Sequence, residues 1–242
     1  MPTQIDLLAL SITILAPTLF WAGYHYYRDR RQPEPWPQTL LAFVAGIAAG
    51  WFGQILYHGL GVLGLWFDPY QLAAGHPLGL LLYSLLGIAL VEELAKLLPF
   101  LLIIRWLPAF DEPVDGIIYA AFIALGFASY ENFYYLEFLS PQEQLARGLS
   151  SPLIHCLFAS LWGYPLGRAI VAGQPLGIPL TKGLGAAVFV HGIYDFLVFG
   201  MAMWPRLLAA TMILAVWLWR MHLMERVLPA QQAKPESGAS VS

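Results

Sequence analysis

Residues 78–105 read LGLLLYSLLGIALVEELAKLLPFLLIIR, an apolar run whose only charged residues before Arg105 are Glu92, Glu93 and Lys96. About 20 apolar residues in an α-helix are enough to cross the roughly 30 Å hydrocarbon core of a bilayer. The three internal charges need a specific reason, because each costs roughly 2.5–3.5 kcal/mol at the bilayer centre. This stretch therefore predicts a transmembrane helix that carries chemistry.

The rest of the chain has the composition of a membrane protein. Of its 242 residues, 59% are hydrophobic and only 11% are charged, whereas a soluble domain carries roughly 25% charged residues. Hydropathy predicts six further spans, at 5–27, 38–66, 114–138, 150–172, 177–200 and 204–224. We expect an all-α, polytopic membrane protein of about seven transmembrane helices, with a single domain over 1–228. Residues 229–242 are polar and predict a disordered cytoplasmic tail.

Lysine and arginine in the short loops predict the orientation. The loops on one side of the predicted spans hold Arg28, Arg30, Arg31, Arg105, Arg168, Lys182, Arg220, Arg226 and Lys234. Those on the other side hold only Arg147 and Arg206. The richer side faces the cytoplasm, so the N-terminus is predicted outside and the C-terminus in the cytoplasm. No basic stripe suggests a nucleic-acid partner.

Three more predicted spans carry ionisable residues. Glu131 lies in the fourth span, His155 in the fifth, and His191 with Asp195 in the sixth. His191 and Asp195 are four residues apart, so a helix points both side chains toward one region. From a rise of 1.5 Å per residue, Glu131 lies about 10 Å and His191 about 14 Å below the outer end of its span. All these groups can therefore meet in one cavity in the outer half of the membrane.

Histidines and carboxylates together form a ligand set that suits zinc with an open position for water. A bound zinc ion lowers the pKa of its water to about 7, and a nearby carboxylate can then act as general base. One of the adjacent Glu92 and Glu93 is a candidate for that base.

Structural roles are the alternative for each group. Glu92 and Lys96 can form an intrahelical ion pair that makes burial tolerable, while Glu93 points about 100° away. His155 can be an interhelical hydrogen-bonding residue, and His191 with Asp195 can be a structural pair.

Four segments together resemble the PrsW family of membrane proteases. They are Glu92-Glu93-x-x-Lys96, the segment GFASYEN at 126–132, His155, and the segment HGIYDF at 191–196. The similarity covers about residues 30 to 200. A wider relationship to CAAX-prenyl endopeptidases and bacteriocin-processing membrane proteins is implied, but Lys96 replaces their usual arginine and Glu131 replaces a histidine. Prenyl-protein processing is therefore not the expected activity.

The resemblance implies regulated intramembrane proteolysis in a bacterial cytoplasmic (inner) membrane. The substrate would be a membrane protein or peptide, such as a membrane-bound anti-sigma factor cut at site 1 on the extracytoplasmic side. We expect a metalloendopeptidase in which Glu92 and Glu93 activate water beside Lys96, with Glu92 the preferred base. The expected zinc ligands are Glu131, His155, His191 and Asp195. A metal-free version, in which a glutamate activates water and the histidines hold the oxyanion, stays open.

Two other functions fit the same residues. Buried Glu, His and Asp also serve as proton relays in a proton-coupled transporter. A non-catalytic membrane binding or immunity protein could have kept the fold without the activity.

Overall fold

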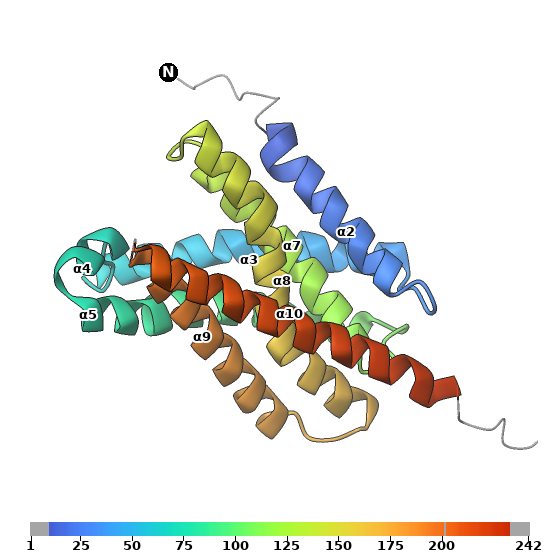
Figure 1. Cartoon of the computed structure of the whole chain (residues 1–242). Helices are drawn as coiled ribbons and strands as arrows, with labels where there is room; N and C mark the ends of the chain where they lie inside the picture. The colour runs from blue at the N-terminus through green and yellow to red at the C-terminus, as the bar shows by residue number, and fades with distance from the viewer. Residues whose placement is uncertain (1–9, 201, 233–242) are drawn as a thin grey trace, which may run out of the picture.

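The computed structural model describes residues 10–200 and 202–232, and within these ranges it contains helices and no strand. In chain order the elements are η1 (Ser11–Leu15), α2 (Ala16–Arg28), α3 (Trp36–Val62), α4 (Pro69–Gly75), α5 (Pro77–Leu82), η2 (Tyr83–Ala89), α6 (Leu90–Ile103), η3 (Ile104–Trp106), α7 (Asp115–Tyr135), α8 (Pro141–Val171), α9 (Gly177–Phe199) and α10 (Met203–Gln232). Helices α7 and α8 run through the middle of the molecule, and α10 crosses the front of the view (Figure 1). The expected all-α fold is confirmed.

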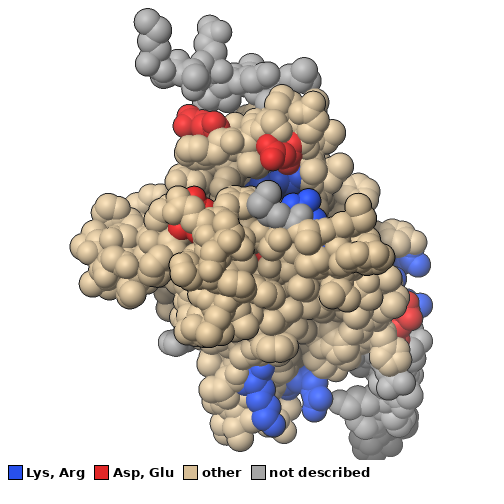
Figure 2. All heavy atoms as spheres, turned by 60° about the vertical axis from the view of Figure 1, so that its left-hand side comes forward, with Lys and Arg blue, Asp and Glu red and all other residues tan. Residues whose placement is uncertain are grey.

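Within the described residues, four helices are both long and apolar enough to cross a membrane. They are α3, α7, α9 and the Met203–Glu225 part of α10. Large apolar side chains such as Phe20, Trp106 and Trp204 are exposed on the surface. Figure 2 shows a face that is mostly uncharged, with the acidic and basic side chains in small separate patches. This surface suits lipid as its solvent. The count of seven spans and the orientation stay predictions.

The run at 78–105 is not one uniform helix. It is divided into α5, the π-helical η2, α6 and the short 3-10 helix η3. A π-helix bonds residue i to i+5, so its wider turns rotate the faces of the following helix. Because η2 ends at Ala89, this change in winding comes just before Glu92. Hydropathy cannot detect it, since apolar residues fill both kinds of helix.

Two helix ends differ from the predicted ones. Helix α8 begins at Pro141, nine residues before the predicted start at 150, because Ser140 and Glu143 form a reciprocal capping box and proline occupies the first turn. Helix α10 continues to Gln232, so residues 229–232 of the expected disordered tail are helical. Residues 233–242 lie outside the described part. A hydropathy window misses both extensions because they are polar.

Helix α7 is buried between α3 and α8, and glycines allow the close packing. A Cβ atom at Gly126 would lie 2.0 Å from the carbonyl oxygen of Phe43 on α3. One at Gly116 would lie 2.2 Å from the carbonyl oxygen of Gly163 on α8. Small residues at such crossings let membrane helices approach closely. This packing brings the ionisable residues of α6, α7, α8 and α9 toward a common centre.

Candidate active site

Helix α6 places two carboxylates and a lysine inside the protein. Lys96 and Glu93 have no exposed side-chain surface, and Lys96 Nζ lies 2.6 Å from Glu93 Oε1. The distance from Lys96 Nζ to Glu92 Oε2 is 4.0 Å. The Glu92–Lys96 ion pair considered from the sequence is therefore present at a long distance, while the closer ion pair joins Glu93 and Lys96, three residues apart. Both spacings are neighbours on a helix, and the tertiary surroundings select between them.

Glu93 is fully engaged by three partners. Besides Lys96, its Oε1 lies 2.9 Å from His191 Nδ1, and its Oε2 accepts a hydrogen bond of 3.0 Å from the indole N–H of Trp162. A carboxylate held in this way is fixed in position. It can orient His191, because a metal-binding or catalytic histidine is commonly fixed by a carboxylate on its other nitrogen.

His191 directs its second nitrogen toward two carboxylates. Its Nε2 lies 3.8 Å from Glu92 Oε2 and 3.4 Å from Asp195 Oδ2. The ring of Phe158 stacks on the imidazole at 4.5 Å and holds its plane. When Nδ1 donates to Glu93, a neutral imidazole presents a lone pair at Nε2.

His155 is held at both nitrogens. Its Nε2 lies 2.9 Å from Glu131 Oε2, and its Nδ1 lies 3.1 Å from Lys96 Nζ. An ammonium group can only donate, so Nδ1 accepts from Lys96 and Nε2 carries the proton that goes to Glu131. Arg147 contacts the other oxygen of Glu131, with an N–O distance of 2.8 Å.

Glu92 has one fixed oxygen and one free oxygen. The hydroxyl of Tyr57 donates to Glu92 Oε1 at 3.0 Å, whereas Glu92 Oε2 is buried without a hydrogen-bond partner among the described residues. Asp195 Oδ2 is likewise buried and has no hydrogen-bond partner among the described residues. Buried carboxylate oxygens without partners are costly, so this convergence of acceptors favours a cation, a water molecule or a substrate group there.

The donor atoms fit a metal ion such as zinc. Ligand atoms of Glu92, Glu131 and His155 all lie within 4.8 Å of one another. The lone pair of His191 and the free oxygen of Asp195 are adjacent to this group. Imidazole nitrogens and carboxylate oxygens are normal zinc ligands.

Side-chain exposure shows which side of the site opens outward. Arg147 is 29% exposed, Asp195 13% and Glu131 12%, while Glu93 and Lys96 are completely buried. The opening is therefore on the Arg147 side, and Lys96 forms the closed end. The seven site residues predicted from the sequence are all brought together in this one cluster.

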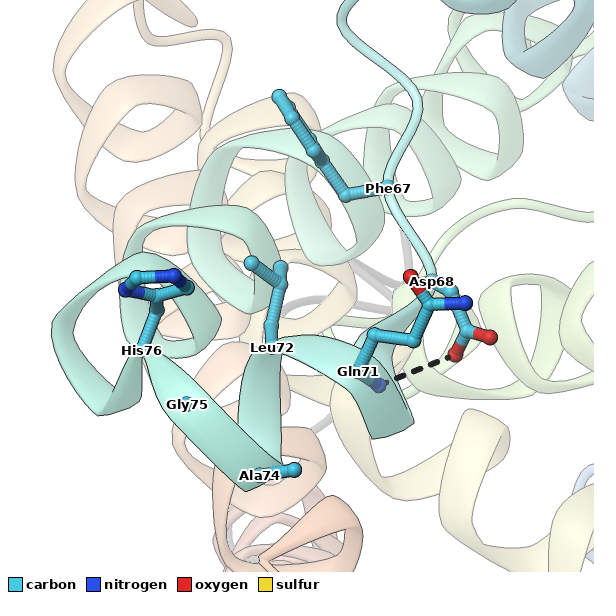
Figure 3. Close-up of a pocket in the computed structure, with 7 residues that line it drawn as sticks. All are labelled: Phe67, Asp68, Gln71, Leu72, Ala74, Gly75 and His76. Atoms are coloured by element: carbon cyan, nitrogen blue, oxygen red, sulfur yellow. Dashed lines mark hydrogen bonds between the residues drawn. The ribbon is translucent and has the colours of Figure 1, made fainter.

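A surface pocket lies elsewhere and contains none of the cluster residues. It has a volume of about 400 Å³ and is lined by Phe67, Asp68, Gln71, Leu72, Ala74, Gly75 and His76. Figure 3 shows these residues on the turn of α4 and the segments that flank it, with Asp68 accepting a hydrogen bond from the backbone N–H of Gln71. Because Asp68 caps the start of α4, we assign it a structural role.

Sequence reasoning missed three residues that contact the cluster: Tyr57, Arg147 and Trp162. Trp162 follows His155 by seven residues, which is two helical turns, so the periodicity of α8 could have indicated it. The hydropathy prediction places Arg147 in a loop, because it starts the fifth span at residue 150. No sequence signal separates Tyr57 from the other aromatic residues near the ends of spans.

Comparison with known proteins places the site in a family. The family model described as "PrsW family intramembrane metalloprotease" matches residues 34–221. Protease PrsW of Geobacillus kaustophilus (strain HTA426) is 31% identical over 204 residues, covering 84% of this chain and 85% of the relative. Protease PrsW of Bacillus subtilis (strain 168) is 28% identical over 207 residues, covering 84% of this chain and 88% of the relative. Protease PrsW of Oceanobacillus iheyensis (strain DSM 14371 / CIP 107618 / JCM 11309 / KCTC 3954 / HTE831) is 28% identical over 213 residues, covering 88% and 93%.

No solved structure matches the chain significantly. The family match covers well over half of the sequence and includes every residue of the cluster. It also supports a peptidase over the transporter that the buried charges allowed. The chain belongs to the PrsW family of intramembrane proteases.

Proposed function

We propose that this protein hydrolyses a peptide bond inside the membrane with Glu92 as the general base. The observation that carries the proposal is the arrangement of the Glu92 carboxylate. Tyr57 fixes one oxygen, and the other oxygen is buried and free, facing His155 and His191. A general base must lie within reach of the proton that it removes, and this oxygen is the available acceptor at the centre of the cluster.

The proposed reaction uses one proton twice. Glu92 takes a proton from water as the water oxygen attacks the scissile carbonyl carbon. When the C–N bond breaks, Glu92 gives the same proton to the leaving amine. Lys96 places a positive charge 4.0 Å from the Glu92 carboxylate and is held there by Glu93, so the closed end of the site stays electrostatically balanced.

We further propose that the site holds zinc. His191 Nε2 and Asp195 Oδ2 are the free atoms that would hold it, and His155 would join them through Nδ1 in exchange for its contact with Lys96. Glu131, expected as a ligand, has its two oxygens engaged by Arg147 and His155 and would orient His155 instead. Bound zinc would polarise the scissile carbonyl and make its water more acidic. Glu93 would then orient His191 from the outside of the site.

The proposed substrate is a membrane protein similar to an anti-sigma factor, cut near the extracytoplasmic surface of a bacterial cytoplasmic membrane. The exposure of Arg147, Asp195 and Glu131 supports this, because the site opens toward the α7–α8 connection. The bias of basic loop residues supports the same proposal, in which that connection lies outside in a protein of seven spans with its N-terminus outside and its C-terminus in the cytoplasm.

Elemental mass spectrometry of the purified full-length protein tests the metal. We expect near-stoichiometric zinc in the wild type and in His222→Ala, which alters an exposed histidine of α10, and a loss of zinc in His191→Ala. Absence of metal from all three proteins after zinc is supplied would rule out the zinc site and leave the metal-free mechanism.

A cleavage assay tests whether Glu92 is the general base. The protein would be co-produced in bacteria with an epitope-tagged, single-span anti-sigma factor, and fragments would be followed by immunoblotting. Wild type should release a fragment and Glu92→Gln should not. A fragment of equal yield from Glu92→Gln would refute the role of Glu92.

A further inference from the structure

We propose that Arg147 is a positioning residue for the protease site, acting through Glu131 on His155. The inference rests on the proposed function, because it assigns His155 a place in the active site. The contacts form a continuous line: Arg147 to Glu131 Oε1 at 2.8 Å, and Glu131 Oε2 to His155 Nε2 at 2.9 Å. The line ends on His155 Nδ1, which lies 3.9 Å from the free oxygen of Glu92.

The fold holds Arg147 at a fixed place. The side-chain amide of Gln144, one turn earlier, donates to the carbonyl oxygens of Leu136 and Leu139 and so ties α8 to the end of α7. The guanidinium of Arg147 lies over the ring of Tyr135, 4.2 Å from its centroid. Both contacts restrict the arginine to the side of α7 that carries Glu131.

A neighbouring contact fixes the same turn of α8 from the other side. Gly148 packs against η1, where a Cβ atom would lie 2.6 Å from the carbonyl oxygen of Thr13. The first turns of α8 are therefore packed against both η1 and α7. Because this turn is held on two sides, Arg147 has little freedom to move, and it can therefore fix the position of the Glu131 carboxylate.

The contact orients Glu131 as well as stabilising the fold. The Arg147 side chain is 29% exposed and the Glu131 side chain 12%, so the ion pair is largely screened from water and holds the carboxylate in place. Glu131 has two oxygens to place, and Arg147 determines which one is left for His155. Without the arginine, the Glu131 carboxylate can rotate away. Lys96 still donates to Nδ1 and keeps the proton on Nε2, but that Nε2–H then loses its acceptor and the imidazole loses one of the two contacts that fix its plane.

The first test observes His155 directly and needs no substrate. Full-length protein with 15N-labelled histidine would be placed in phospholipid nanodiscs, and the His155 signals would be assigned from a His155→Gln spectrum. We expect one tautomer, protonated on Nε2, in the wild type, in Arg206→Gln (an exposed arginine of α10) and largely in Arg147→Lys. Arg147→Gln should keep this tautomer but shift the Nε2 and Nε2–H signals, because the hydrogen bond from His155 to Glu131 weakens. An unchanged His155 spectrum in Arg147→Gln would overturn the proposal.

The second test measures cleavage of the tagged anti-sigma factor. Arg147→Gln should lower the rate about 10–100-fold, as expected for a residue that orients an active-site histidine, and Arg147→Lys should recover part of it. In a Glu131→Gln background, Arg147→Gln should have no further effect. An equal loss in both backgrounds would overturn the proposal. If wild type cleaves nothing, the proposed function fails, while the spectra still decide whether Arg147 orients His155.

Discussion

Replacing Lys96 with methionine should strongly destabilise the protein, and the size of the effect follows from its surroundings. The substitution removes the positive charge at similar side-chain length and leaves the fully buried Glu93 carboxylate without its closest partner, 2.6 Å away. Breaking a buried ion pair by removing one member costs about 3–5 kcal/mol. We expect the lower end, about 3 kcal/mol, because His191 and Trp162 still donate to Glu93.

Double-mutant cycles can show which of the two adjacent glutamates pairs with Lys96. Lys96→Met should couple to Glu93→Gln by about 2–3 kcal/mol, because the two side chains share a short charge-assisted hydrogen bond. Its coupling to Glu92→Gln should be below about 1 kcal/mol, since Glu92 lies 4.0 Å away and is not hydrogen-bonded to the lysine.

The free energy of unfolding would be measured in detergent micelles by titration with sodium dodecyl sulfate, followed by circular dichroism. Lys182→Met, at an exposed position on α9, is the matched control and should change stability by less than about 0.5 kcal/mol. Equal stability of Lys96→Met and Lys182→Met would refute the reasoning. So would rescue of Lys96→Met by Glu92→Gln in place of Glu93→Gln.

Two further predictions concern residues near the two ends of α3. Tyr57→Phe removes the hydrogen bond that fixes Glu92. Because a hydrogen bond to a charged group contributes about 1.5–3 kcal/mol, the cleavage rate should fall about 10–100-fold. An unchanged rate would show that Tyr57 does not position the base. In the α2–α3 connection, burial and the charge of Asp115 raise the pKa of Glu34 to about 9, so the folded protein keeps a proton that the unfolded chain loses above about pH 4.3. The free energy of unfolding should therefore fall as the pH rises from about 4.3 to about 9, and Glu34→Gln should make this fall shallower. Micelle titrations of both proteins at about pH 6 and 8 check the prediction. A wild type that gains stability over that range relative to the variant would contradict it.

The helical fold was predictable because its main determinant is local. Long apolar runs leave few options in a bilayer, where every backbone N–H and C=O must be hydrogen-bonded within the segment. The ends of α8 and α10 were not predictable from hydropathy, because Ser140 and Glu143 extend a helix through capping and not through apolarity. The π-helical winding of η2 was hidden for a related reason, since it changes hydrogen bonding without changing composition.

The sequence by itself determined which ionisable residues lie inside the predicted spans and can therefore meet. Ionisable groups are so costly in hydrocarbon that Glu92, Glu131, His155 and His191 could be selected without a structure. Only the tertiary structure decided how they pair. Glu93 forms the short ion pair with Lys96, and Glu92 keeps one oxygen without a hydrogen bond. This difference arises because the groups that hydrogen-bond to the two carboxylates come from α3, α8 and α9. Helix periodicity fixes neighbours along one helix, but the choice between two adjacent carboxylates depends on groups that only the packing of distant helices brings within hydrogen-bonding distance.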